Sequence, residues 1–340
     1  MISWRLAFGI LLICSIGSRT YAQPSDAEPI RRAAQAGAYP AAFDLLARSD
    51  GRDGFDSSHY PNQPVRRQPA HLGYANYLLK APIPLWSDDK QGFVADVLLQ
   101  NLAVRTNAIL PDDRVRFPNH FTEVQLGGTY YKLLANGWSW AASLSAGSAS
   151  DRPFQSTREM VYYSSGFLRI PNGERNAWLF TIFLETNSQA GGNYPIPGVG
   201  YEFNPSDTFS GVLGLPFSYL TVTPKKGWNL DLSYHLLTNV RAQSTMAIHD
   251  KLKWYTAAVW HNQSWLRADR PNSNDLFNWF EKRLETGLLW SIHPNARAEL
   301  IGGYAFNRYF VENQGFSLGG RNRVDVQNSA YLSFRVSLMY

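Results

Sequence analysis

Cysteine is almost missing from this 340-residue chain, in which Cys14 is the only one. Ile13 precedes it, where a lipoprotein site needs a small residue, and this argues against lipid attachment. Cys14 also lies in a segment that we expect to be removed. The mature chain would then have no disulfide, no thiolate nucleophile and no cysteine metal site.

Charge is also scarce, because Asp, Glu, Lys and Arg together make up 17% of the residues and the net charge is +5. Residues 1–22 contain Arg5 and Arg19 and no acidic residue, so their removal would leave +3. Such a small excess, spread along the chain, does not form the basic patch that nucleic acid needs. We expect no nucleic-acid partner.

Long apolar runs are limited to residues 6–17, which follow Arg5 and precede the small-residue site at residues 20–22. This order is typical of a secretory signal peptide over residues 1–22, cut before Gln23. The run is shorter than the roughly 20 residues of a membrane-spanning helix. No later stretch could span a membrane as a helix, which leaves a closed β-barrel as the one spanning solution.

Aromatic residues and alternating patterns are what the chain does contain, with 14% Phe, Trp and Tyr. In residues 330–340, every second residue is apolar from Ala330 to Tyr340, and Arg335, Ser333 and Ser337 lie between them. Alternation of this kind predicts a β-strand with two different faces. A strand of a soluble sandwich would show the same alternation, so other segments must decide.

The same two-faced pattern returns around residues 124–130, 138–146, 178–184, 228–236 and 298–306. Rings at the ends of apolar rows are favoured at a membrane boundary, and small or charged rows suit the lumen of a barrel. The candidate boundary aromatics and terminal signal are Trp138, Trp178, Trp228, Trp290, Phe334 and Tyr340. The candidate lumen-facing residues are Asn229, Asp231, Ser233, His235, Arg297, Glu299 and Arg335.

Connections alternate in length along the chain. Short turn signals fall at residues 136–137, 172–173, 204–207, 224–227 and 293–295, between longer polar links near 105–120, 149–158, 187–194, 266–276 and 311–324. Outer-membrane barrels have this asymmetry of tight periplasmic turns and long external loops. We therefore predict an all-β fold, a closed antiparallel transmembrane β-barrel of about 12–14 strands over residues 71–340. It would lie in the outer membrane of a Gram-negative bacterium with both termini in the periplasm.

Two segments leave the predicted strand count open, residues 215–222 and 240–249.

Residues 23–70 are rich in Ala, Arg, Asp and Pro, hold one short helical pattern at 41–48, and then lose all periodicity. This composition predicts a mobile periplasmic N-terminal extension.

The terminal strand resembles that of outer-membrane proteins as a class, which commonly finish on a strand with a terminal aromatic residue. In that class the row Phe334, Val336, Leu338 and Tyr340 would be the signal that the outer-membrane barrel assembly machinery reads. The resemblance implies two partners, this machinery and the lipid bilayer of the outer membrane.

The segment from Asp151 to residue 222 is similar to an uncharacterised bacterial outer-membrane β-barrel family, domain of unknown function 6268. The shared features are Asp151 after the second hairpin, the loop leading into residues 195–198 and the strand to Tyr201, and a strand closing on Pro216. The resemblance would cover roughly residues 90–340. It implies a location and a fold, and it implies no activity.

The predicted strands contain few residues in arrangements that could catalyse a reaction or bind a metal ion. Asp231, Ser233 and His235 share one face, but a triad within one strand has no oxyanion donor, and we expect no enzyme activity. Histidines do not pair with carboxylates at metal-ligand spacing, so we expect no metal and no cofactor. We favour a passive pore for small solutes. The alternatives are a structural or surface-interaction barrel with a filled lumen and, more distantly, an outer-membrane hydrolase.

Overall fold

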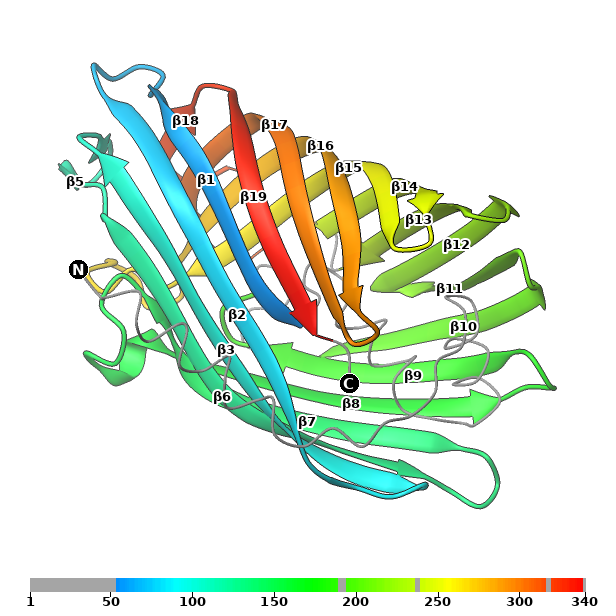
Figure 1. Cartoon of the computed structure of the whole chain (residues 1–340). Helices are drawn as coiled ribbons and strands as arrows, with labels where there is room; N and C mark the ends of the chain where they lie inside the picture. Colours follow the sequence, from blue (N-terminus) through cyan, green and yellow to red (C-terminus); the bar gives the residue numbers. More distant parts are fainter. Residues whose placement is uncertain (1–52, 189–193, 236–238, 316–318, 339–340) are drawn as a thin grey trace.

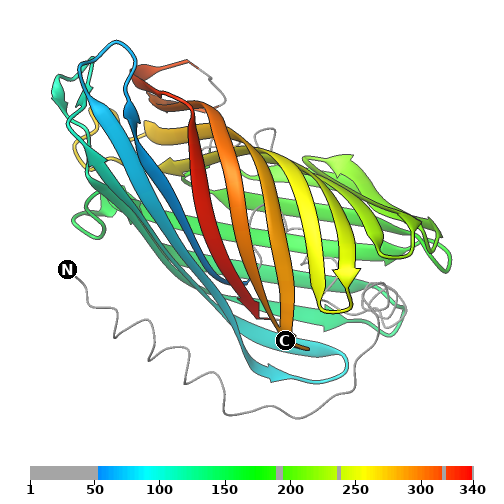
Figure 2. The same cartoon turned by 45° about the horizontal axis from the view of Figure 1, so that its top comes forward.

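A computed structural model describes residues 53–188, 194–235, 239–315 and 319–338. Within these ranges one antiparallel sheet curls into a closed barrel (Figures 1 and 2). No helix in the described ranges is long and apolar enough to cross a membrane. The expected signal peptide, the helical pattern at 41–48 and Tyr340 lie outside the described residues.

The strands follow one another along the chain, with one short 3-10 turn, η1 (Thr157–Glu159), among the described residues. Their bounds are β1 (Gly54–Pro64), β2 (His71–Ser87), β3 (Gln91–Thr106), β4 (Ile109–Leu110), β5 (Val115–Arg116), β6 (His120–Leu133), β7 (Ser139–Ser150), β8 (Met160–Pro171), β9 (Ala177–Glu185), β10 (Ile196–Ser206), β11 (Phe209–Leu215), β12 (Phe217–Lys225), β13 (Trp228–His235), β14 (Asn239–His249), β15 (Leu252–Trp265), β16 (Leu276–His293), β17 (Ala296–Asn313), β18 (Arg321–Val326) and β19 (Ser329–Leu338).

The ring closes where β1 pairs with both β2 and β19. β18 and β19 share one position, because both pair with β17 along different parts of its length. Without the separate β4–β5 hairpin the barrel therefore has 16 strand positions. The predicted all-β closed barrel is confirmed.

The predicted count of 12–14 strands is wrong. Both doubtful segments are strands, β12 and β14, although the outward row of β14 carries small residues such as Ala242 and Ser244 and so shows weak alternation. A further strand, β1, lies where no strand was expected.

The predicted boundary at residue 71 is also wrong, because β1 belongs to the barrel wall. Ser57 pairs with Phe334 and His59 with Leu332, so these two polar side chains occupy the outward row of β1. An outward row with Ser and His lacks the apolar alternation that marks the other strands. The strand is held instead by its neighbours and by inward contacts of Asp56.

Connections of different length lie at opposite ends of the barrel. The turns after β2, β6, β8, β10, β12, β14 and β16 are short, and the connections after β3, β7 and β15 span residues 107–119, 151–159 and 266–275. Gly54 pairs with Ser337, which places the start of β1 and the end of β19 together at the end with short turns. We call this the turn end and the opposite one the loop end.

The wall of the barrel has unequal height (Figure 1). β2, β3, β16 and β17 have 16 to 18 residues, whereas β11, β12 and β13 have 7 to 9. The upper part of the tall wall therefore extends beyond the short wall at the loop end.

Side chains alternate between the two faces of the wall, as the pattern predicts. On β16, Leu284, Leu288 and Trp290 are exposed, and Glu285 and Leu289 between them are buried. The outward face is thus a belt of exposed apolar side chains and the inward face carries the charges. Water would penalise such a continuous apolar belt, whereas lipid would not.

Candidate functional site

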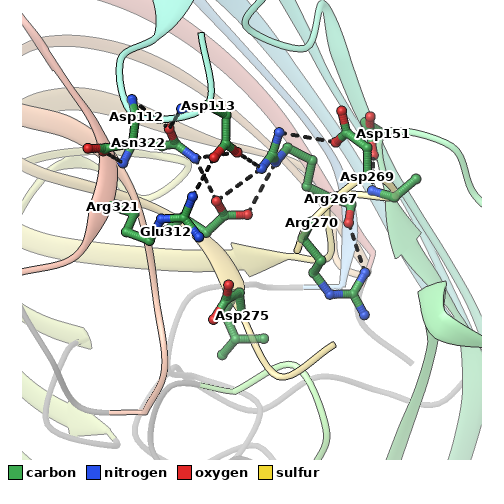
Figure 3. Close-up of polar contacts among 12 residues, drawn as sticks. Asp112, Asp113, Asp151, Arg267, Asp269, Arg270, Asp275, Glu312, Arg321 and Asn322 are labelled. Atoms are coloured by element: carbon green, nitrogen blue, oxygen red, sulfur yellow. Dashed lines mark hydrogen bonds and ion pairs between the residues drawn. The ribbon is translucent and has the colours of Figure 1, made fainter. Parts of the chain in front are cut away.

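Arg267, two residues after the end of β15, is the centre of a cluster of charges at the loop end (Figure 3). Its side chain is 2% exposed. The guanidinium donates to both oxygens of Glu312, at 3.2 and 3.1 Å, and to the Asp113 carboxylate, and it forms an ion pair with Asp269 at 3.1 Å. Three carboxylates from separate segments therefore converge on one buried cation.

Asn322 connects the same carboxylates from β18. Its Nδ2 donates to Glu312 at 2.7 Å and to Asp113 at 2.9 Å. Its amide oxygen accepts from the backbone N–H groups of Asp112 and Asp113 at 3.2 and 3.1 Å. The β4–β5 hairpin, which carries both aspartates, is thereby fastened to β17 and β18.

The environment of Asp113 perturbs its acidity. Burial alone would raise the pKa of this carboxyl, but hydrogen bonds from Asn322 and Arg267 and the positive charge of Arg321 together lower it below its ordinary value. Asp113 therefore stays ionised in moderately acidic solution.

The connection from β15 to β16 crosses the loop end of the barrel. Leu266 donates its N–H to the carbonyl of Ala149 at 2.8 Å, and Ala268 donates to Asp151 at 2.7 Å. These two acceptors lie at the end of β7, eight positions from β15 in the ring of 16, which is the opposite wall. Arg270 and Arg158 add a reciprocal pair of side-chain to carbonyl hydrogen bonds at 2.6 and 3.0 Å.

An apolar core lies in the same region. Phe121 of β6 stacks on Phe277 of β16 with ring centroids 5.1 Å apart, and Trp265 stacks on Trp279 at 6.2 Å. The rest of this core includes Tyr60, Leu72, Tyr74, Leu102, Val104, Leu110, Phe117, Leu276, Phe310, Val324, Val326 and Tyr331. A round 16-strand barrel would be roughly 32 Å across at a strand spacing of about 4.8 Å and a strand tilt of about 40°. Direct ring contact therefore means that the two walls approach each other and that side chains fill this part of the interior.

Sequence reasoning missed this core, although one signal was present. Residues 276–281 are buried on both faces of β16, and they read Leu-Phe-Asn-Trp-Phe-Glu, where two apolar pairs interrupt the alternation. Apolar side chains on both faces of one strand indicate that the inner face also packs against protein.

Charged side chains line the inner wall next to this core. Glu281 is buried and accepts hydrogen bonds from the hydroxyls of Tyr60 and Tyr74, each at 2.7 Å. Arg283 and Arg308 approach the same carboxylate at 3.6 and 3.7 Å. The two tyrosines come from the neighbouring strands β1 and β2, so this carboxylate joins β16 to two strands with which it does not pair.

The charges continue toward the turn end. Glu285 accepts from Tyr331 at 2.6 Å and from Arg241 at 3.0 Å. The predicted lumen residues Glu299 and Arg335 lie 3.5 Å apart, and Arg335 also pairs with Asp56 at 2.6 Å. Sequence analysis had placed Asp56 in the extension and missed this partner.

The remaining predicted lumen residues lie on two strands, Arg297 on β17 and Asn229, Asp231, Ser233 and His235 on β13. The Asp231 carboxylate accepts from the hydroxyls of Tyr219 and Thr221, at 3.0 and 2.8 Å. His235 lies with its ring 6.2 Å from that of Phe183. Asp231 is thus bonded to neighbouring β12 hydroxyls, an arrangement typical of a polar wall.

The four predicted boundary tryptophans lie near the turn end. Trp138, Trp178 and Trp290 are exposed beside short turns, and Trp86 and Trp254, which were not predicted, are also exposed at this end. Trp228 is half-buried and donates its ring N–H to Ser244 at 3.0 Å. Phe334 is exposed on the outward row of β19.

Exposed apolar rows, a ring of tryptophans at the turn end, short turns at one end and long connections at the other define an outer-membrane β-barrel. The loop end is then the extracellular end. The described residues contain no group of three or more His, Cys, Asp and Glu side chains that could hold a metal ion.

Comparison with known proteins gives distant structural likenesses. The beta domain of the Bordetella autotransporter BrkA aligns at 9% identity and a TM-score of 0.29, over 85% of this chain and 100% of that one. An outer membrane channel from Pseudomonas putida F1 aligns at 8% identity and a TM-score of 0.34, over 83% of this chain and 94% of that one. A Pseudomonas aeruginosa FadL homologue aligns at 11% identity and a TM-score of 0.31, over 87% of this chain and 92% of that one. No family model and no curated protein matches this sequence, so the resemblance to domain of unknown function 6268 stays a prediction.

Proposed function

We propose that this protein is an outer-membrane barrel with a filled lumen at its extracellular end, a structural or surface-interaction barrel rather than an open passive pore. The contact between Leu266 and Ala149 is the observation that carries this proposal. It brings a connection from one wall to the opposite wall, directly over a core of stacked aromatic rings. A pore needs a continuous aqueous path, and a packed apolar core interrupts one.

A passive pore for small solutes is the second candidate. A ring of 16 strands is in the size range of open porins, which the predicted 12–14 strands were not. The inward rows of β13 and β14 are also hydrophilic, with Asp231, Arg241 and Gln243 among them. A path along this wall would bypass the core.

Conductance of the purified protein in planar bilayers tests the two candidates. We expect no stable channel steps from the wild-type barrel. Regular open-channel steps from the wild type would contradict the filled-lumen proposal and favour the pore. A variant lacking residues 268–274 shows which part of the structure closes the barrel. If this variant conducts, the β15–β16 connection alone blocks the lumen. If it does not conduct, the aromatic core blocks it.

We also propose that the assembly machinery of the outer membrane reads the last strand. What supports this is the outward row of β19, where Leu332 and Phe334 are exposed next to the closing strand β1. The hydrolase hypothesis has less support, because Asp231 is hydrogen-bonded to Tyr219 and Thr221.

A further inference from the structure

Arginines are concentrated at the extracellular tip of the tall wall. Three segments form this tip, the β1–β2 turn, the β4–β5 hairpin with the end of β3, and β18 (Figures 1 and 2). Five of its arginines are exposed and form no ion pair with the described residues: Arg66, Arg67, Arg105, Arg114 and Arg116. With Arg321 and Arg323 there are seven arginines against Asp112, Asp113 and Asp325, a net charge of +4.

The opposite end of the barrel has no such excess. The turns at residues 88–90, 172–176, 207–208, 226–227 and 250–251 together hold four basic and five acidic residues. The positive charge of the tip is therefore a local feature rather than a consequence of overall composition.

Hydrogen bonds hold the three segments of the tip in one surface. The side chain of Gln68 donates to the carbonyl of Ile109 at 2.9 Å and accepts from its N–H at 3.0 Å, which joins the β1–β2 turn to the β4–β5 hairpin. Arg66 donates its N–H to the carbonyl of Asp325 at 2.8 Å, which joins the turn to β18. The arginines are therefore presented together, although they are far apart in the sequence.

Two of these arginines occupy backbone positions that favour glycine. Arg67 has φ of 65° and Arg114 has φ of 56°. Glycine adopts this left-handed region at no steric cost, and an arginine there is strained. Residues in strained backbone conformations cluster at functional sites, and both of these arginines belong to the exposed basic surface.

The level of the tip relative to the membrane indicates the ligand. Arg105 lies on the outward row of β3, above the exposed Leu99 on the same row. The Arg323 guanidinium lies 4.0 Å from the ring centroid of Tyr309, and tyrosine is enriched at membrane–water boundaries. Six residues separate Arg105 from Leu99, with Asn101 and Ala103 between them on the same row, so the basic surface lies on the extracellular side of the apolar belt, toward the outer-leaflet headgroups.

We infer that this arginine surface binds the phosphate groups of the phosphorylated glycolipid of the outer leaflet. The guanidinium group is suited to this ligand, because its planar fork donates two parallel hydrogen bonds to a phosphate. Phosphate would also neutralise the positive charges of this surface. Five of its arginines form no ion pair with a described carboxylate.

Binding to bisphosphorylated lipid A tests the inference. The test variant changes Arg66, Arg67, Arg114 and Arg116 to Gln, and the matched control changes four cations of the turn end, Lys90, Arg175, Lys226 and Lys251, to Gln. Full-length protein in detergent is titrated with lipid A, with lipid A lacking both phosphates, and with inorganic phosphate. Heat-modifiable migration on gels verifies that each variant is folded.

We expect the loop-end variant to lose lipid A affinity at least tenfold and the control less than twofold, with weak binding of dephosphorylated lipid A. Equal affinity of both variants, or equal binding of the dephosphorylated lipid, would overturn the inference. Saturation by inorganic phosphate without lipid A binding would overturn it too, since the ligand would then be a free anion. Arg67→Gly separates ligand binding from folding, because it should weaken lipid A binding and at the same time raise the unfolding temperature by relieving strain.

Discussion

Leu266 and Ala149 are joined by a backbone hydrogen bond of 2.8 Å across the extracellular end of the barrel, although their strands are on opposite sides of the ring. Barrel walls are normally connected through their neighbours. Here a direct link shortens the path between opposite walls and fixes the position of Arg267, the next residue along the chain. The buried charges around Arg267 depend on that position.

Arg267→Ala should destabilise the protein by about 3–5 kcal/mol, because it leaves Glu312 buried without its cation. The matched control is Arg323→Ala, whose partner Asp325 is partly exposed, and which should cost less than about 1 kcal/mol. Urea unfolding in detergent, followed by tryptophan fluorescence, measures both. Equal stability of the two variants would show that the cluster contributes nothing to the fold.

Acid should release the β4–β5 hairpin only at low pH. The pKa of Asp113 is lowered in the folded protein, so its stabilising contribution is fully present above the unfolded value of about 3.9. The contribution is lost as pH falls through the lower folded pKa. An acid titration of tryptophan fluorescence should therefore show a transition below about pH 4. Asp113→Asn should lack this transition and should be less stable at neutral pH, and an unchanged transition in this variant would rule Asp113 out as its source.

The cost in stability of an arginine on the outward row of β19 should depend on the depth of the substituted residue in the membrane. Leu332 is exposed and lies six residues from Leu338, about 15 Å along the membrane normal for a tilted strand. Leu332→Arg should cost about 2–4 kcal/mol near the midplane, and Leu338→Arg about 0–1 near the boundary. Refolding equilibria in lipid vesicles measure the difference. A larger cost at Leu338 would mean that the membrane level assigned here is wrong.

Deletion of Tyr340, or a polar tail added after it, should lower the amount of folded protein in the outer membrane and leave secretion across the inner membrane intact. The reason is that assembly would depend on the terminal row of β19. Cell fractionation with protease accessibility separates the two steps. Normal assembly of both variants would contradict recognition of this strand.

The outer face of the barrel could be predicted from the sequence and most of the interior could not. Contact with lipid requires an apolar side chain at every second residue of a strand. The spacing alone therefore predicts the outward position of Leu332, Phe334 and Trp290. The inner wall has no such rule. Asp56 and Arg335 are separated by 279 residues, and only the closure of the ring brings them together. β1 was missed for the same reason, because inward contacts rather than an apolar row hold it in place.

The short wall has a consequence for the surrounding lipid. β11 has seven residues, which at about 3.3 Å each and a tilt of about 40° rise roughly 18 Å, less than the roughly 25 Å apolar band of such barrels. Leu213 and Leu215 are exposed up to the extracellular edge of this strand. The bilayer must therefore thin beside β11 and remain thicker beside β16. The barrel imposes a gradient of thickness around its circumference, and short-chain lipids should collect on one side of it.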